Sequence, residues 1–349
     1  MKGGLLLSAS THPQNTVPEG LPKGIVQKRL PGGELPKAKL QMMLDVGKPF
    51  GRLHRGETPA CIEICLYMSP MIALLLHTDV TMSAASAACR LFVTAVLPGL
   101  FPYMVLSLMA VSRVQRPSPP LVMLLGWGGG SPTGARLLSL CAGLNRQEQV
   151  RLAVSCATMS PMFLLGTVGG WLESGVAGVV CLISVIAGGW LAGLAAGRAA
   201  LCRPSAQGAD RRTAEGRSDD HPAALAPLSF GAAVEQSVRT MLLVCGTMVM
   251  LRVFAALAAA ALPSVCVLPV TTLLEVTTGA VEIAGLPLPL MWKTALIAGA
   301  AGFGGMAILM QNRAVYPAGF MPLGQQVLWQ AAHGGFSFLL ALGMMWLLC

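Results

Sequence analysis

Charged residues are scarce in this chain of 349 residues: Asp, Glu, Lys and Arg make up 11% of it, whereas hydrophobic residues make up 54%. Soluble domains carry about a quarter charged residues, so an ordinary soluble domain is excluded. Several apolar runs reach or approach the roughly 20 residues that cross a bilayer as a helix. They cover residues 91–110, 176–196, 241–262 and 326–348. These features predict an all-α polytopic membrane protein in a lipid bilayer.

The sequence also lacks the common motifs of catalysis and of cofactor binding. Its 10 cysteines are scattered without a CxxC pair, so neither a disulfide framework nor a metal site is expected. HExxH, GxSxG and the nucleotide-binding pattern GxxxxGK[ST] are missing, as are paired carboxylates at helical spacing. We therefore expect no enzymatic activity, no cofactor and no bound metal.

Nucleic-acid binding is not expected, although the formal net charge is +9. Lys and Arg crowd residues 1–60 and the loop 198–217, beside apolar segments. Basic flanks of this kind mark the cytoplasmic side of a membrane protein. Aromatic residues make up 5% of the chain, and no basic face is interleaved with them as nucleic-acid binding would require.

The apolar segments predict about seven full spans and two broken, re-entrant helical hairpins. The broken stretches cover about 120–142 and 264–290, where Gly, Pro and hydroxyl residues interrupt the apolar pattern. The distribution of Lys and Arg places the first hairpin on the cytoplasmic side and the second on the external side. The predicted spans cover residues 61–78, 89–112, 153–172, 176–197, 237–260, 293–311 and 326–348.

The order of these segments repeats along the chain. A span, a broken hairpin and two spans occur at 89–197 and again at 237–348, with an odd number of crossings between the two sets. Inverted repeats with broken helices are typical of secondary transporters. The predicted organisation is a disordered cytoplasmic segment at 1–58, a first span with the first gate-like repeat at 59–200, a cytoplasmic linker at 201–228 and a second gate-like repeat at 229–349.

The glycine-rich stretch GWGGGSPTGAR, residues 126–136, breaks the first hairpin. Irregular backbone at membrane depth is tolerated only where it is buried in protein or lines a wet cavity. Pro132 suits the first turn of a new helix and Ser131 its cap, so this helix N-terminus and Arg136 would form an anion site. Alternatively, the glycines only allow close packing and Arg136 snorkels to water. The candidate binding residues of this stretch are Gly130, Ser131, Pro132, Thr133, Gly134 and Arg136.

The second broken stretch contains Glu275 among apolar and hydroxyl residues. A carboxylate within the membrane is a functional candidate by default, and Glu275 would bind a coupling ion, either Na⁺ or H⁺. The alternative is a hydrated glutamate in an external loop. Thr158 and Ser160 in the span 153–172, and Gln311 in the span 293–311, would line the same binding cavity as Glu275. Alternatively, the two hydroxyl residues only satisfy a kinked backbone, and Gln311 lies at the membrane interface. The candidates outside the first hairpin are Thr158, Ser160, Glu275, Thr277, Thr278, Gly279 and Gln311.

Two other polar or small-residue patterns have a packing interpretation. Gly189, Gly193 and Gly197 recur every four residues, as in closely packed membrane helices. We interpret His333 as a packed residue rather than a proton carrier. Arg252 lies within an apolar run and needs a partner or water.

Five segments in order resemble the sporulation integral membrane proteins of the YlbJ type, which carry a nucleoside-recognition, or gate, domain. The segments are residues 96–103 (VLPGLFPY), 129–136 (GGSPTGAR), 157–166 (ATMSPMFLLG), 274–279 (LEVTTG) and 303–311 (FGGMAILMQ). The chain departs from the family pattern at two positions, where Ser131 replaces a tyrosine and Ala157 an asparagine. The resemblance implies a relation to concentrative nucleoside transporters and a role in endospore formation, with dipicolinic acid as a transported anion.

We therefore expect a membrane transporter, either a secondary carrier or a facilitator, for a small anionic or nucleoside-like metabolite. Its expected location is the bacterial cell membrane, as a multi-pass protein, or the membrane around the forespore. The alternative is a non-transporting integral membrane scaffold or assembly factor in spore envelope or cortex formation. Assembly as a homo-oligomer is compatible with either function, and the sequence does not identify the substrate.

Overall fold

The computed structural model describes residues 60–114, 117–141, 144–201, 227–317 and 319–348, and within these ranges the chain is helical without a β-strand. The predicted all-α class is therefore confirmed. The predicted N-terminal segment 1–58 and nearly all of the linker 201–228 lie outside the described residues.

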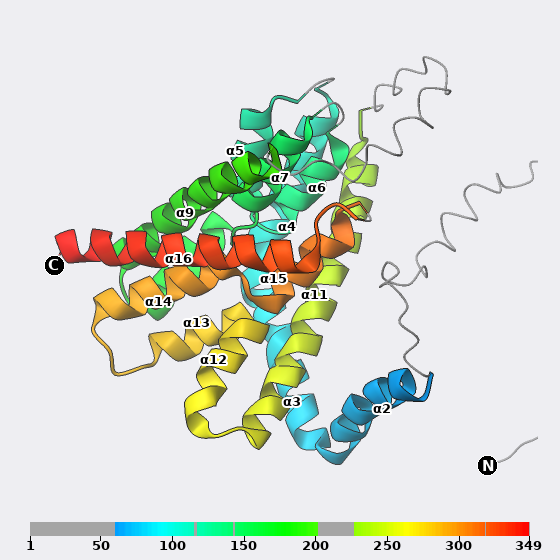
Figure 1. The fold of residues 1–349 in the computed structure, drawn as a ribbon, viewed down its shortest axis with the longest axis vertical. Coiled ribbons are helices and arrows are strands. Elements are labelled where there is room, and N and C mark those ends of the chain that lie inside the picture. The colour runs from blue at the N-terminus through cyan, green and yellow to red at the C-terminus, as the bar shows by residue number, and fades with distance from the viewer. Residues whose placement is uncertain (1–59, 115–116, 142–143, 202–226, 318, 349) are drawn as a thin grey trace, which may run out of the picture. The chain divides into compact units, whose positions relative to one another are not determined.

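Most of the helices follow one another through short connections, as the colour sequence in Figure 1 shows. In chain order they are α2 (Ala60–Leu76), α3 (Thr78–Leu91), the π-helix η2 (Phe92–Val96), α4 (Leu97–Ser112), α5 (Pro119–Gly129), α6 (Thr133–Leu140), α7 (Arg146–Ser155), the π-helix η3 (Phe163–Val168), α8 (Gly169–Trp171), α9 (Gly175–Leu201), α11 (Phe230–Ala261), α12 (Ser264–Leu274), α13 (Val276–Ala284), α14 (Leu290–Phe303), α15 (Gly305–Val315) and α16 (Leu323–Leu348).

Within the described ranges, 5 helical stretches are long and apolar enough to cross a membrane. This number is compatible with a multi-pass membrane protein, which supports the membrane location in general terms. The stretches are Thr78–Ser112, Gly175–Leu201, Phe230–Ala261, Leu290–Val315 and Leu323–Leu348. The first combines α3, η2 and α4, so the helix extends well before residue 89, where the sequence pattern placed its start.

Two of the seven expected spans are not among these stretches, for different physical reasons. The expected span 61–78 corresponds to α2, a helix of 17 residues that contains Pro70. The expected span 153–172 is interrupted, because α7 ends at Ser155 and helical structure resumes only at Pro161.

Helix α7 begins after a reciprocal capping arrangement at Asn145. Asn145 Oδ1 accepts from the Glu148 backbone N–H at 2.8 Å, and the Glu148 carboxylate accepts from the Asn145 N–H at 3.0 Å.

Helix α9 packs against α7 and α16, and its glycines make the close approach to α7 and α16 possible (Figure 1). A Cβ at Gly193 would lie 2.0 Å from Ser155 Oγ, and one at Gly197 would lie 3.2 Å from the Arg151 Cβ. A Cβ at Gly189 would lie 3.0 Å from His333 Nε2. The packing interpretation of these glycines is therefore confirmed.

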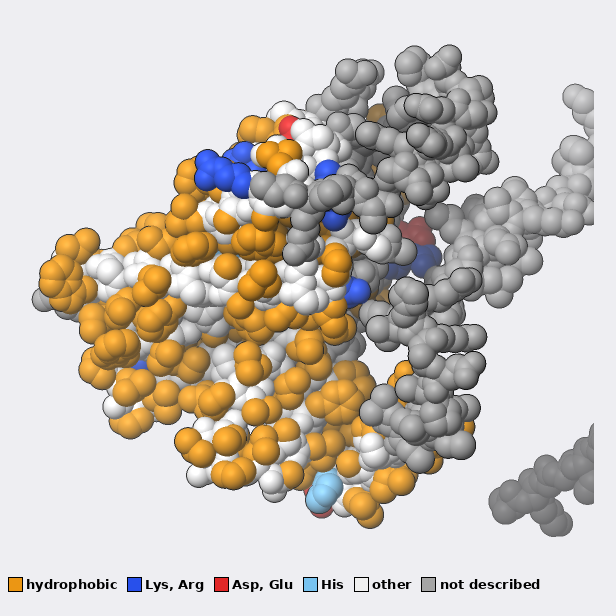
Figure 2. All heavy atoms as spheres, viewed as in Figure 1, with side chains coloured by type: hydrophobic (Ala, Val, Ile, Leu, Met, Phe, Trp, Pro, Cys, Tyr) orange, Lys and Arg blue, Asp and Glu red, His pale blue; other side chains and the backbone are white. Residues whose placement is uncertain are grey.

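Apolar side chains cover much of the face shown in Figure 2, which is consistent with contact to lipid. Exposed hydrophobic residues include Leu242 on α11 (68% exposed), Leu339 on α16 (63%) and Leu106 on α4 (65%). Most of the Lys and Arg side chains visible on this face gather towards its upper part. Soluble monomers rarely expose contiguous apolar surface of this extent.

Candidate functional site

The first break in the helical pattern lies between α5 and α6, where the glycine-rich sequence predicted it. Helix α5 ends at Gly129, Gly130 has a φ of +66°, and α6 begins at Thr133. A Cβ at Gly130 would lie 2.5 Å from the Ser160 backbone N and 2.9 Å from the Met159 carbonyl carbon. Glycine is required here both by the backbone conformation and by the close approach of a second chain segment.

Ser131 does not cap α6, contrary to the sequence-based expectation. The N-cap position is Pro132, which offers no side-chain hydrogen bond. The Ser131 hydroxyl instead donates to Asn312 Oδ1 at 2.6 Å, and the Ser131 backbone N–H donates to the Thr158 carbonyl at 2.6 Å. The expectation was wrong because tertiary partners on α15 and after α7 compete for the polar groups of Ser131.

The second break lies between α12 and α13, and Glu275 occupies it. The Glu275 backbone is extended, with φ −136° and ψ 100°, and its side chain is 2% exposed. One carboxylate oxygen accepts from the Thr277 N–H at 3.0 Å; the other accepts from the Thr278 N–H at 2.7 Å and from the Thr278 hydroxyl at 2.6 Å. Glu275 therefore caps α13 from a buried position and does not lie in an exposed loop.

Each of these breaks contacts the break of another interrupted helix. Gly130 contacts the segment Cys156–Ser160 that separates α7 from η3, as described above. In the second half, α14 and α15 meet at Gly304 and Gly305, whose φ values are +76° and +66°. A Cβ at Gly305 would lie 3.2 Å from the Leu273 carbonyl oxygen and 3.4 Å from the Val276 N, on either side of Glu275. Irregular backbone from distant parts of the chain is thus gathered within the protein, as burial in a membrane requires.

A small cavity of about 60 Å³ opens where these breaks meet. Its polar lining comes from Ser131 and Ser160 in the first half and from Glu275, Thr277 and Gln311 in the second half. Its apolar lining includes Val244 and Met248 of α11 and Phe163 of η3. A mostly apolar wall with a few convergent polar groups is the usual composition of a small-molecule site.

The other predicted residues lie around this cavity without lining it. Gly134 packs against Cys156, and Gly279 packs against Thr272, so both serve close packing. Thr158 is fully buried and contributes its carbonyl oxygen to Ser131. Thr278 bonds Glu275 and faces a neighbouring groove. The remaining residues outside the lining are Gly130, Pro132, Thr133 and Arg136.

Arg136 does not join the helix N-terminus in an anion site at the cavity. It lies one turn into α6, is partly exposed, and is not part of the cavity lining. Its Nε atom is buried without a hydrogen-bond partner. The only ionisable side chain that lines the cavity among the described residues is Glu275.

Two polar residues outside the list of candidate binding residues hold the site together. Asn312 is 1% exposed and accepts the Ser131 hydroxyl, and Thr247 of α11 accepts a 2.9 Å hydrogen bond from Gln311 Nε2. Asn312 follows Gln311 directly, so an amide pair at the end of an apolar run is a signal that could have identified it. Thr247 carries no such signal, because threonine within a membrane helix commonly bonds its own backbone, as Thr247 also does with the Leu243 carbonyl.

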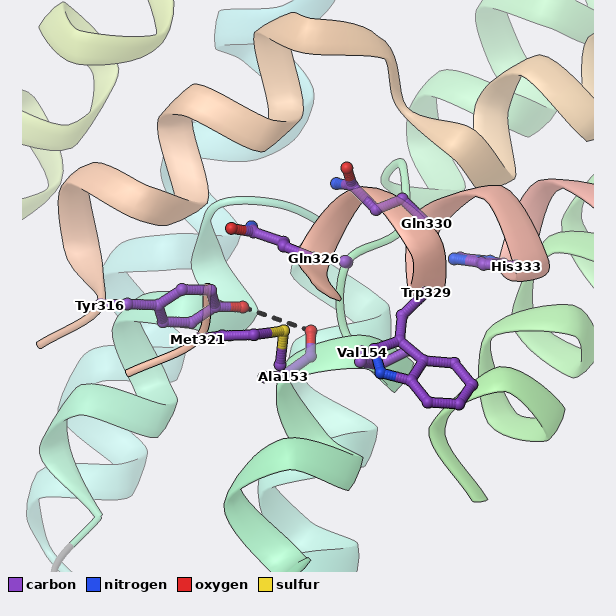
Figure 3. Close-up of a pocket in the computed structure, with 9 residues that line it drawn as sticks. Ala153, Val154, Tyr316, Met321, Gln326, Trp329, Gln330 and His333 are labelled. Carbon is purple, nitrogen blue, oxygen red and sulfur yellow. Dashed lines mark hydrogen bonds between the residues drawn. The ribbon is translucent and has the colours of Figure 1, made fainter. Parts of the chain in front are cut away.

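A second polar cavity, of about 10 Å³, lies between α7 and the first half of α16 (Figure 3). His333 is 1% exposed, and its Nε2 lies 2.9 Å from the Val185 carbonyl oxygen, so Nε2 carries the proton and Nδ1 of the neutral ring is an acceptor. Tyr316 closes one side and donates to the Ala153 carbonyl at 3.2 Å. Among the described residues, buried side-chain atoms of Gln326, Trp329, Gln330 and His333 have no hydrogen-bond partner.

This geometry can be compared with known proteins. No family model, no curated protein and no solved structure matches the chain. The resemblance of five segments to a sporulation membrane-protein family therefore stays an expectation.

Proposed function

We propose that the protein is a membrane transporter, a secondary carrier or facilitator, for a small nucleoside-like or anionic metabolite. The observation that carries the proposal is the cavity between the helix breaks, to which residues about 180 positions apart contribute buried polar groups. In a bilayer, broken helices with polar residues at their breaks are the usual elements of a transporter binding site. Ser131, Ser160, Thr277 and Gln311 would hydrogen-bond the substrate, and Glu275 would bind it or a coupling ion.

We further propose that the chain contains two inverted gate-like repeats. The first repeat would comprise Thr78–Ser112, the pair α5–α6, the interrupted segment from α7 to α8, and α9. The second would comprise α11, the pair α12–α13, the interrupted pair α14–α15, and α16. Each set has a long helix, two interrupted elements and a long helix, in that order. Opposite orientation of the two sets would bring both breaks to the middle of the membrane and allow alternating access.

The lining favours a nucleoside-like substrate over a small dianion. Nucleosides present hydroxyl and ring-nitrogen groups that pair with serine, threonine and glutamine side chains. An anion would meet the carboxylate of Glu275, and no Lys or Arg among the described residues lines the cavity to offset it. Dipicolinic acid is the anion that the family resemblance suggests, so its uptake is measured beside that of nucleosides.

Uptake into liposomes that contain only the purified protein tests the proposal. Labelled nucleosides and labelled dipicolinate are each compared with empty liposomes. We expect nucleoside uptake, and a loss of roughly tenfold in Gln311→Ala, since one hydrogen bond to a buried polar group contributes about 1–3 kcal/mol. The control is Glu235→Gln, whose carboxylate is exposed and pairs only with Arg239 on α11. Absence of uptake for every solute would contradict transport and favour the membrane scaffold.

A further inference from the structure

A larger polar groove lies on the far side of Glu275, between α3, η2, α11 and α13. Its volume is about 540 Å³, within the range of about 300–1,000 Å³ that is usual for small-molecule pockets. Glu275 lines both the groove and the small cavity, so its carboxylate lies between the two spaces. The polar residues of the groove on which the argument rests are Ser86, Arg90, Thr94, Arg252, Glu275 and Glu282.

The groove contains charged side chains that lie well within two of the helical stretches long enough to cross a membrane. At 1.5 Å per residue, Arg90 lies about 18 Å from the start of the long helix at Thr78, and Arg252 lies about 14 Å from the end of α11. Glu282 lines the same groove, but neither Arg90 nor Arg252 forms an ion pair within 4.0 Å in the part of the chain that the structure describes. Charged side chains within a membrane face a water-filled cavity or the bundle interior, because their cost in hydrocarbon is high.

We propose that this groove is a water-filled vestibule through which small hydrophilic solutes reach Glu275. Water in the groove solvates Arg90, Arg252 and Glu282, which hydrocarbon cannot do. The volume of the groove is large enough for a small metabolite, whereas the cavity beyond Glu275 is about 60 Å³ and would have to widen to hold one. Because side chains of both charge signs line the groove, it admits solutes of either sign.

This inference goes beyond the proposed transport and does not depend on it. Hydration of a groove is a property of the protein in its bilayer and can be measured without any substrate. If uptake fails and the groove is hydrated, the vestibule stands without the carrier.

Thr94 and Val93 form a matched pair for the test. The two residues are adjacent in η2, and both are exposed, Val93 by 56%, but only Thr94 lines the groove. Thr94→Cys and Val93→Cys are reconstituted separately into liposomes of phosphatidylcholine and phosphatidylglycerol and treated with water-soluble methanethiosulfonate reagents, one cationic and one anionic. Mass spectrometry reads the modification of each residue, so the native cysteines need not be removed.

The vestibule predicts that Thr94→Cys reacts about tenfold faster or more than Val93→Cys, because a thiol in hydrocarbon stays protonated and unreactive. It also predicts modification by reagents of both signs. Equal protection of both cysteines would overturn the proposal, since the groove would then hold lipid. Equal reaction of both would overturn it as well, because this face would then lie outside the bilayer. In detergent with denaturant both cysteines must react, and Ser86→Cys gives a second reporter in the groove if Thr94→Cys does not fold.

Discussion

Replacement of Gly130 by alanine tests whether the first break has the backbone that lets it pack against the segment between α7 and η3. Gly130 combines a φ of +66° with a Cβ position 2.5 Å from the Ser160 N. At Gly130 the positive φ is combined with a ψ of −166°, a conformation that is nearly exclusive to glycine and costs an alanine about 1–3 kcal/mol. The contact with backbone atoms cannot be relieved by a side-chain rotation, and overpacking of this kind costs about 1–3 kcal/mol. We therefore expect Gly130→Ala to lower the free energy of unfolding by about 2–6 kcal/mol.

The assay is thermal unfolding of the purified protein in detergent, followed by intrinsic fluorescence. At roughly 2 °C per kcal/mol for a large domain, the expected decrease in apparent Tm is about 4–12 °C. Gly343→Ala is the matched control, because nothing lies within 4 Å of its Cβ position in α16 and alanine favours a helix by about 1 kcal/mol over glycine. An apparent Tm of Gly130→Ala equal to that of the wild type and the control would refute the reasoning.

Three further substitutions follow from single contacts, and each is measured as a change in apparent Tm. Glu275→Ala should destabilise the protein by about 1–2 kcal/mol more than Glu275→Gln, because alanine leaves the first backbone N–H groups of α13 without an acceptor; equal effects would exclude the capping role. Gly193→Ala should cost about 1–3 kcal/mol, because its Cβ would lie 2.8 Å from the Arg151 carbonyl oxygen; a neutral effect would contradict the close packing of α9 on α7. Gln330→Leu should stabilise the protein by about 1–2 kcal/mol, because both amide atoms are buried without a partner; destabilisation would show that bound water satisfies them.

The sequence predicted the positions of the helix breaks better than the residues that contact them. The glycines and the proline before Thr133 are local signals, and the structure ends α5 and begins α6 there. Glu275 was identified because a carboxylate is rare in an apolar segment, and it occupies the break between α12 and α13. The partner of Ser131 could not be predicted, since Asn312 lies 181 positions away and only the packing of α15 against α6 brings it near.

Hydropathy also placed some helix ends poorly. Residues 78–88 are small and partly polar, so the pattern placed the start of that span near residue 89, yet α3 begins at Thr78. Ala84 and Ala88 are buried, and α3 packs against α11, so tertiary contact stabilises a helix that hydropathy alone does not favour. The span expected at 153–172 is interrupted in the structure around Thr158 and Ser160, where the sequence places hydroxyl residues before Pro161 within an apolar stretch.

The proposed binding site depends most on the hydrogen bond between Ser131 and Asn312, which joins the two halves of the chain. The direct measurement is cross-linking of the double variant Ser131→Cys/Asn312→Cys in liposomes with a short bismethanethiosulfonate, with mass spectrometry of the joined peptides. The hydroxyl and amide oxygens lie 2.6 Å apart, so we expect efficient cross-linking in the double variant and none in either single variant. Failure to cross-link in a double variant that remains folded and whose thiols react separately would contradict the shared cavity and, with it, the proposed binding site.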